Sequence, residues 1–168
     1  MATVTTVPLE VYLRSSYEPD AEYVDGIIEE RPVVQLDHAK WQRALLRYFD
    51  QHRNEWNVEA YAELHVQVAQ TRFRVPDVTV LDRAAPTEQI VTTPPIAVFE
   101  ILSPEDAMQR MLVKLADYER MSIGGIFLID PATGTYWRQE GSLRSATDEE
   151  RVGDRFTISF PEIRQYLD

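Results

Sequence analysis

Three charged side chains interrupt apolar patterns in this sequence: Asp77, Glu100 and Lys114. Glu100 lies inside the almost continuously apolar run 96–102, where an uncompensated carboxylate would cost several kcal/mol or become protonated. Asp77 follows Pro76 at the start of another apolar run, a position that also suits an ordinary turn residue. Because local patterns are usually broken at functional sites, these three residues are the first candidates for chemistry.

The lysine interrupts an apolar stripe on a predicted helix. The stripe is formed by residues three and four positions apart: Ala107, Met111, Lys114, Tyr118 and Met121. This helix directly follows the strand of Glu100, and a right-handed crossover packs such a helix back onto its sheet. Glu100 and Lys114 are therefore expected to approach each other, and Asp77 joins them if its strand is a neighbour.

Two carboxylates and one ammonium group in a shared cleft suit phosphoryl transfer with a hard divalent cation. Oxygen atoms of Asp77 and Glu100 would hold Mg²⁺ with several waters retained, and the metal would activate a water molecule. Lys114 would orient that water or stabilise the developing negative charge. The alternative is a buried salt bridge that only braces the scaffold, which is the commoner explanation of a single charge of this kind.

The first half of the chain predicts a hairpin, a helix and a strand pair. The turn Asp25-Gly26 lies between 22–24 and 27–28, which is a strong hairpin signal. From an N-cap at Asp37, apolar side chains recur every three or four residues and predict a helix that ends near Arg53. Alternation over 64–68 and 73–81 predicts an antiparallel pair of strands.

The second half predicts a β-α-β unit. The runs 96–102 and 126–129 are typical of strands that are buried on both faces. Between them, Ser103 is the expected N-cap of a helix, with Pro104 in its first position. A strand over 135–138 and a helical turn over 161–167 follow, so the whole order predicts an α/β fold with a mixed sheet flanked by helices.

Composition sets the limits on function. A chain of 168 residues with 44% hydrophobic residues suits one compact domain. The 17 basic and 28 acidic side chains give a net charge of −11, which argues against a broad surface for non-specific nucleic-acid binding. The absence of Cys excludes disulfides, thiolate metal sites and cysteine nucleophiles. Without a membrane-spanning run or a secretory leader, a cytoplasmic location is expected.

Taken in order, these motifs resemble the Uma-two family of restriction-endonuclease-like proteins, within the PD-(D/E)XK nuclease superfamily. The resemblance covers about residues 17–130. It rests on Glu22-Tyr23-Val24-Asp25-Gly26, His38, Arg74-Val75-Pro76-Asp77-Val78, Glu100-Ile101-Leu102-Ser103-Pro104, Lys114, Tyr118 and Phe127-Leu128-Ile129-Asp130-Pro131. It implies a single restriction-endonuclease-like domain over 1–168, with its core at about 17–138.

The resemblance also implies a metal site. Asp77 and Glu100 would be ligands of Mg²⁺ or Mn²⁺, and the backbone carbonyl of Ile101 often completes such a site. The superfamily's lysine usually lies two residues after the acid, where this chain has Leu102, so the resemblance places it at Lys114 instead.

Other residues have two interpretations each. Glu22 resembles the superfamily's auxiliary acid, although it also suits an exposed strand charge beside a hairpin. Arg72 and Arg74 lie on one side of the strand that leads to Asp77, either as contacts to a phosphate backbone or as solvated edge charges. His38 matches the family pattern, as a hydrogen-bonded packing residue or as a catalytic one.

The leading hypothesis is a metal-dependent endonuclease that hydrolyses DNA phosphodiester bonds. Superfamily members commonly dimerise, so a homodimer with two sites facing two strands is implied as well. The acidic net charge opposes DNA binding unless a local basic strip or a dimer cleft gathers the phosphates. The alternative is a catalytically inactive, nuclease-like binding or assembly module, because a fold does not determine function. Glycoside hydrolysis by paired carboxylates ranks lower, since it leaves Lys114 unexplained.

Overall fold

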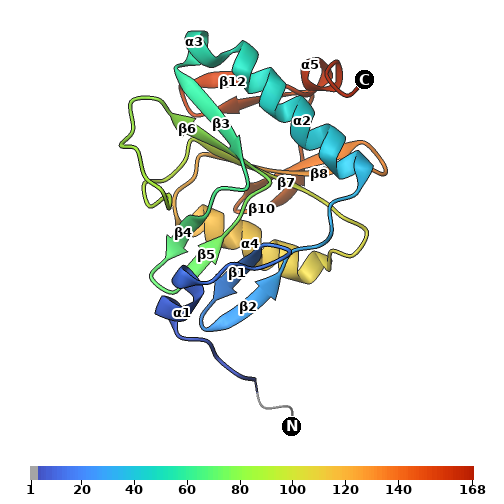
Figure 1. Cartoon of the computed structure of the whole chain (residues 1–168). Coiled ribbons are helices and arrows are strands. Elements are labelled where there is room, and N and C mark those ends of the chain that lie inside the picture. The colour runs from blue at the N-terminus through green and yellow to red at the C-terminus, as the bar shows by residue number, and fades with distance from the viewer. Residues whose placement is uncertain (1–3) are drawn as a thin grey trace.

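The fold is built around a six-stranded mixed sheet with strand order β10-β9-β8-β7-β6-β3 (Figure 1). In the computed structural model, which describes residues 4–168, β7 and β8 run parallel and the other neighbours in this sheet are antiparallel. The strands are β3 (Val58–Ala62), β6 (Val78–Asp82), β7 (Ala97–Ile101), β8 (Gly125–Asp130), β9 (Thr135–Glu140) and β10 (Ser142–Ser145). The predicted mixed sheet and its β-α-β unit are confirmed.

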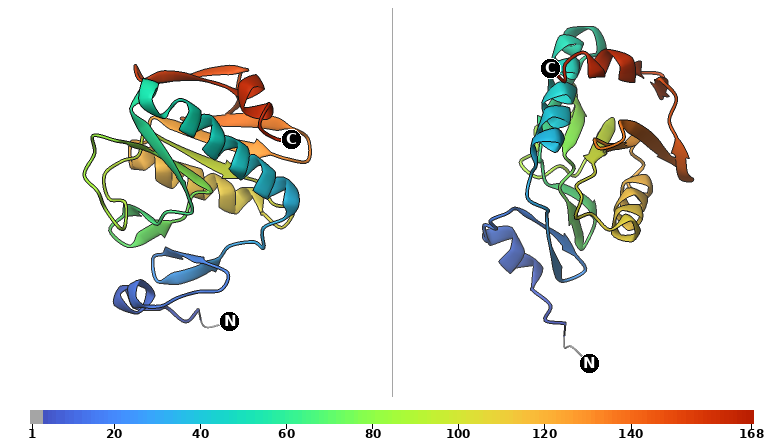
Figure 2. Two further views of the ribbon diagram at one scale, coloured as in Figure 1. Left: turned by 45° about the horizontal axis from the view of Figure 1, so that its top comes forward. Right: turned by 90° about the vertical axis from the view of Figure 1, so that its right-hand side faces the viewer.

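Helices cover both faces of this sheet (Figure 2). The main helices are α2 (Leu36–Gln51), α4 (Met108–Arg120) and α5 (Phe160–Arg164). Phe99 of β7 packs in a core with α2 and α5, whereas Val98 packs in a second core with α4. Because successive side chains of a strand point to opposite faces, Glu100 shares the α4 face with Val98. The crossover helix therefore covers the carboxylate, as the apolar stripe predicted.

A second, four-stranded antiparallel sheet has the order β2-β1-β5-β4. Its strands are β1 (Ala21–Val24), β2 (Ile27–Glu30), β4 (Val66–Ala69) and β5 (Arg72–Arg74), and the short helix α1 (Leu9–Arg14) packs beside them. Asp25 and Gly26 both have positive φ, at 50° and 94°, as the tight turn between β1 and β2 requires. The predicted hairpin is confirmed, and it carries Glu22.

One predicted strand is wrong. The sequence predicts a single strand over 73–81, but the chain divides there between the two sheets. β5 pairs with β1 and β4, whereas β6 pairs with β3 and β7. Pro76 lies at the crossing and has no N–H group to donate to a strand ladder, which explains the break. Asp77 is thereby placed at the junction of the two sheets.

Two predicted helix starts are also wrong. Ser103 does not cap α4, because its N–H donates to Asp106 Oδ2 at 2.7 Å and closes a local turn, so the helix begins at Met108. The N-cap of α2 is Gln35, and Asp37 lies in the first turn, where a negative charge complements the helix dipole. α2 ends at Gln51, and the short helix α3 (Arg53–Trp56) follows.

The last third of the chain adds elements that the sequence did not predict. β11 (Glu149–Val152) and β12 (Phe156–Ser159) form a separate two-stranded ribbon, and β10 forms one edge of the central sheet. The opposite edge strand, β3, comes from the first half of the chain and was not predicted either. The predicted terminal helical turn is confirmed as α5, capped by the Ser159 side chain. Ile158 and Ile163 are fully buried in the main core. Among the described residues, no helix is long and apolar enough to cross a membrane.

Candidate active site

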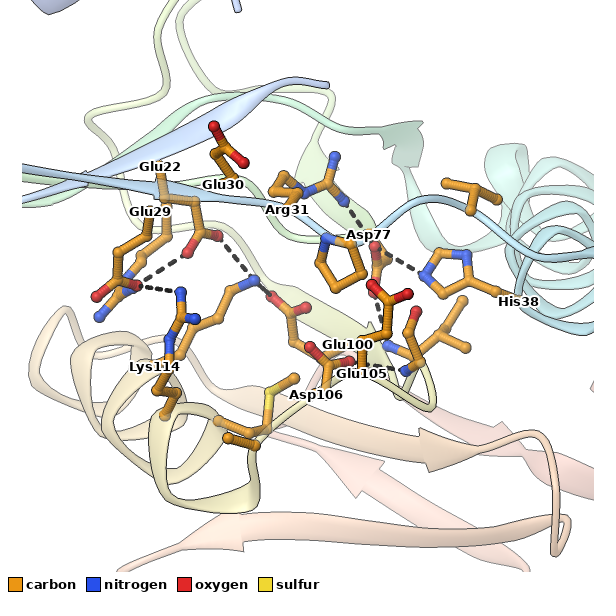
Figure 3. A pocket seen from close by; sticks show the side chains of 18 of the residues that line it. Glu22, Glu29, Glu30, Arg31, His38, Asp77, Glu100, Glu105, Asp106 and Lys114 are labelled. Atoms are coloured by element: carbon orange, nitrogen blue, oxygen red, sulfur yellow. Dashed lines mark hydrogen bonds and ion pairs between the residues drawn. The ribbon is translucent and has the colours of Figure 1, made fainter. Parts of the chain in front are cut away.

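The four residues predicted to carry catalysis line one cavity of about 650 Å³ (Figure 3). They are Glu22, Asp77, Glu100 and Lys114. Ile101 belongs to the same lining. Side chains from the β1–β2 hairpin, from α4 and from the junction of the two sheets meet there, so the site depends on the complete arrangement of the fold.

Strand pairing brings the two central carboxylates together. In the antiparallel pair of β6 and β7, Val78 is opposite Phe99. Asp77 precedes β6 and Glu100 follows Phe99, so the register places both acids at the same end of the pair. The side chains of both residues are almost completely buried.

Lys114 bridges two of the acids from the facing helix. Its Nζ lies 2.9 Å from Glu100 Oε1 and 2.7 Å from Glu22 Oε1. Tyr118, one helical turn further along α4, donates its hydroxyl to Glu100 Oε1 at 2.5 Å. Glu22 Oε1 also accepts the backbone N–H of Val75 at 2.8 Å. The ammonium group is therefore held in one place by a strand of each sheet.

Asp77 has a different set of partners. Its Oδ2 accepts the backbone N–H of Ile101 at 2.7 Å. Its Oδ1 lies 2.7 Å from Arg31 Nη2 and 3.1 Å from His38 Nε2. The Gln42 side chain donates to the Asp77 carbonyl oxygen at 2.9 Å. His38 is therefore hydrogen bonded, as expected of a packing residue. Its partner is Asp77, the predicted metal ligand.

The environment separates the pKa values of these acids. Burial raises the pKa of Glu100 to about 8, with the charges of Asp77 and Glu22 adding to the effect and Lys114 opposing it. Burial alone would also raise the pKa of Asp77, but His38, Lys114 and Arg31 outweigh it and lower that pKa. The pKa of Asp77 therefore lies below that of Glu100, and Asp77 is the more readily ionised of the two acids.

For Glu22 and Lys114 as well, burial and the neighbouring charges shift the pKa in opposite directions. Burial opposes ionisation of Glu22, but the charges of Lys114 and Arg74 lower its pKa. Burial would lower the pKa of Lys114, but the charges of Glu100, Glu22 and Asp77 raise it above its ordinary value. The neighbouring acids therefore favour the charged form of Lys114 in the cavity.

A buried arginine, Arg74, pairs with Glu22 and so contacts the site from the protein interior. Arg74 is only 2% exposed, and its guanidinium reaches Glu22 Oε2 at 3.1 Å, Glu29 Oε2 at 3.0 Å and Asp117 Oδ2 at 2.7 Å. The interpretation of Arg74 as a solvated edge charge is therefore wrong. Arg72 is more open and pairs with Asp25 and Asp117. Glu22 likewise lies in the interior and is not an exposed strand charge.

The chain is similar to known proteins in both sequence and fold. The family Uma2, described as "Putative restriction endonuclease", matches residues 9–154. The chain belongs to the Uma2 family. A crystal structure of a putative nuclease belonging to DUF820 from Anabaena variabilis ATCC 29413 has the same fold, with a TM-score of 0.80 at 20% identity over 96% of this chain and 99% of that one. No curated protein matches the sequence.

The donor chemistry of this Uma2 site fits a hard divalent cation. Asp77 and Glu100 supply carboxylate oxygens, and Mg²⁺ is typically bound by one or two carboxylates with water and phosphate oxygens completing its shell. Within residues 4–168, however, no group of three or more His, Asp or Glu side chains is arranged to hold a metal. Each acid is instead paired with a protein cation, so a metal would have to replace some of these pairs.

Two residues that line or support the Uma2 site, Arg31 and Asp117, were not among the predicted site residues. Arg31 follows the hairpin in an irregular segment with no periodicity, and its contact with Asp77 joins residues that are 46 positions apart. Asp117 is buried on α4 between Arg72 and Arg74. In the sequence, Asp117 is marked only by its place directly before Tyr118 of the apolar stripe. That position alone is too weak a signal to identify a site.

Proposed function

We propose that this Uma2 protein is a metal-dependent endonuclease that hydrolyses DNA phosphodiester bonds. The observation that carries the proposal is the convergence of Glu22, Asp77, Glu100 and Lys114 on one cavity. These residues come from segments that are distant in the sequence, and a scaffold needs no such meeting of three acids and a lysine. Membership of the Uma2 family, with its description "Putative restriction endonuclease", supports the same assignment.

Each residue has a role that follows from its contacts. Asp77 and Glu100, with the carbonyl oxygen of Ile101, would hold Mg²⁺ or Mn²⁺. A cation bound there supplies Lewis acidity at the scissile phosphate and lowers the pKa of a bound water. Lys114 neutralises negative charge that develops on the phosphate, because its ammonium is fixed beside Glu100. Glu22 positions Lys114 through its 2.7 Å ion pair.

Phosphate contacts outside the centre come from the rim. Arg110 lies on α4 one turn before Lys114 and lines the cavity, and its side chain is 62% exposed. It can therefore reach a DNA backbone without giving up a buried partner. Arg72 is the second candidate, whereas the burial of Arg74 suits it to positioning Glu22. A homodimer would present two such rims to the two DNA strands.

Cleavage of supercoiled and linear DNA in Mg²⁺ or Mn²⁺ tests the proposal. Asp77→Asn should lower the rate by on the order of 100-fold or more, because it removes a charge needed in the transition state. Asp82→Asn is the matched control: it alters another acid of the same strand region, which pairs with Arg155 away from the cavity. Equal cleavage by wild type and Asp77→Asn would overturn the assignment.

A second candidate function is a nuclease-like module for binding or assembly. It is favoured by one observation: the acids of the cavity are already paired with Arg31, His38 and Lys114. If those pairs only brace the scaffold, titration calorimetry will detect no uptake of Mg²⁺ or Mn²⁺. Glu100→Ala would then be clearly less stable than wild type, because it removes a bracing partner from buried Lys114 and Tyr118.

A further inference from the structure

We propose that Arg31 occupies the cation's place on Asp77 when no cation is present, and that cation binding transfers this arginine to Glu63. The inference rests on the proposed function and concerns how the same site is regulated. It assigns Arg31 as a positioning residue that competes with the metal, and Glu63 as its second acceptor.

Arg31 is held inside the cavity. It directly follows β2, in the segment that leads from the hairpin to α2, and its backbone N–H donates to the Asp20 carbonyl at 3.2 Å. Its side chain is only 12% exposed and lines the cavity. An arginine withdrawn from solvent in this way is held by what it contacts, and its shortest contact is the 2.7 Å pair with Asp77 Oδ1.

The Asp77 carboxylate has a limited number of acceptor positions. An ionised carboxylate has about four acceptor positions, two on each oxygen. Oδ1 is shared by Arg31 and His38, and Oδ2 accepts the Ile101 N–H. A divalent cation on Oδ1 must displace a partner, and on either oxygen it would lie close to the guanidinium charge. An imidazole can be neutral at physiological pH, but a guanidinium cannot, so Arg31 is the partner that has to move.

A second acceptor, Glu63, lies beside the Arg31 guanidinium. Glu63 Oε1 lies 3.5 Å from Arg31 Nη1, which is an ion pair but longer than a good hydrogen bond. The Glu63 side chain is 39% exposed, and within residues 4–168 it has no other ion pair. A small shift of the guanidinium would therefore shorten the pair with Glu63 while it leaves Asp77. The planar fork of arginine can hold both acids at once, which a lysine could not do in the same way.

Calorimetric titration with Mn²⁺, in the absence of DNA, tests the competition directly. Arg31→Gln should bind Mn²⁺ about tenfold more tightly than wild type, because the competitor is removed. Arg110→Gln is the charge-matched control: it removes a positive charge from the same cavity lining, but from a residue that pairs with Glu29 and not with Asp77. If Arg31→Gln gains no more affinity than Arg110→Gln, the inference is wrong.

Glu63→Gln gives a second test that does not depend on the folding of Arg31→Gln. It should weaken Mn²⁺ binding several-fold, since Arg31 loses its second acceptor and stays on Asp77. Glu30→Gln controls for the loss of a negative charge, because Glu30 lines the cavity. An equal loss of affinity in Glu63→Gln and Glu30→Gln would contradict the role of Glu63. The role would also be contradicted if adding Glu63→Gln to Arg31→Gln lowered the Mn²⁺ affinity by the same factor as Glu63→Gln does in wild type.

The outcomes separate this inference from the proposed function. If neither wild type nor Arg31→Gln takes up Mn²⁺, both the metal-dependent function and the competition are wrong. If wild type takes up Mn²⁺ and its affinity does not respond specifically to Arg31, the proposed function stands and the competition alone fails.

Discussion

At the scale of single residues, the site is a chain of alternating charges. Buried Arg74 holds Glu22, Glu22 holds Lys114, and Lys114 holds Glu100. Each charge is neutralised by its neighbours, which is the condition under which ionised groups are tolerated in a protein interior. The position of the lysine is therefore determined in part by an arginine that lies behind Glu22 and pairs with it.

Replacement of Arg74 by Met should be strongly destabilising. The substitution keeps much of the volume but leaves Glu22 and Asp117 buried without their shared cation, which costs about 3–5 kcal/mol. Urea denaturation of the purified variant measures the loss. Arg155→Met is the control, because Arg155 forms a partly exposed pair with Asp82 and its loss should cost no more than about 1 kcal/mol. Similar losses in the two variants would contradict the buried network.

At the scale of elements, the sequence predicted what depends on short-range periodicity. The stripe on α4 identified Lys114, and the apolar runs identified β7 and β8, because a single helix or buried strand determines those patterns. The division of 73–81 into β5 and β6 was missed, because alternation continues across Pro76 although the chain changes sheets there. Arg31 was missed for a related reason: its partner is defined by the meeting of two sheets, which no local pattern encodes.

The start of β8 offers a test of how tightly the β-α-β unit is packed. A Cβ atom at Gly125 would lie 3.0 Å from Phe127 Cε2 and 3.1 Å from the Ala97 side chain of β7. Gly125→Ala should therefore destabilise the protein by about 1–3 kcal/mol through overpacking. The neighbouring Gly124 is the control, since its nearest contact would be an ordinary 3.6 Å, and Gly124→Ala should change stability by less than about 1 kcal/mol. Denaturation midpoints at constant m-value give both numbers, and equal effects would refute the packing argument.

At the scale of the whole molecule, positive charge is scarce where DNA would need it. Most of the 17 Lys and Arg side chains form ion pairs inside the described chain. Lys40, Arg43 and Arg47 are exposed along α2, whose first turns also bring His38 and Gln42 to Asp77. With a net charge of −11, any affinity for DNA must come from such local groups and from bound cations.

The attachment of the C-terminal ribbon gives the molecule a defined response to acid. Glu150 of β11 is only 4% exposed and pairs with Arg138 of β9 and Arg144 of β10 at 3.0 and 2.8 Å. Burial would raise its pKa, but hydrogen bonds from Arg144, the Thr147 N–H and Arg138 lower it from 4.5 to about 2. The folded state thus holds this carboxylate ionised at a pH where the unfolded chain binds a proton.

The ionised Glu150 carboxylate stabilises the folded state at neutral pH and stops doing so in acid. Because the folded pKa is depressed, the stabilising contribution of Glu150 is complete above about pH 4.5 and is lost as the pH falls toward 2. Glu150→Gln should cost about 2 kcal/mol at pH 7, where charged hydrogen bonds are replaced by neutral ones. Urea denaturation at a series of pH values should show the difference between wild type and Glu150→Gln shrinking below pH 4.5. A difference that stays constant down to pH 2 would mean that the ionisation of Glu150 does not contribute to the stability.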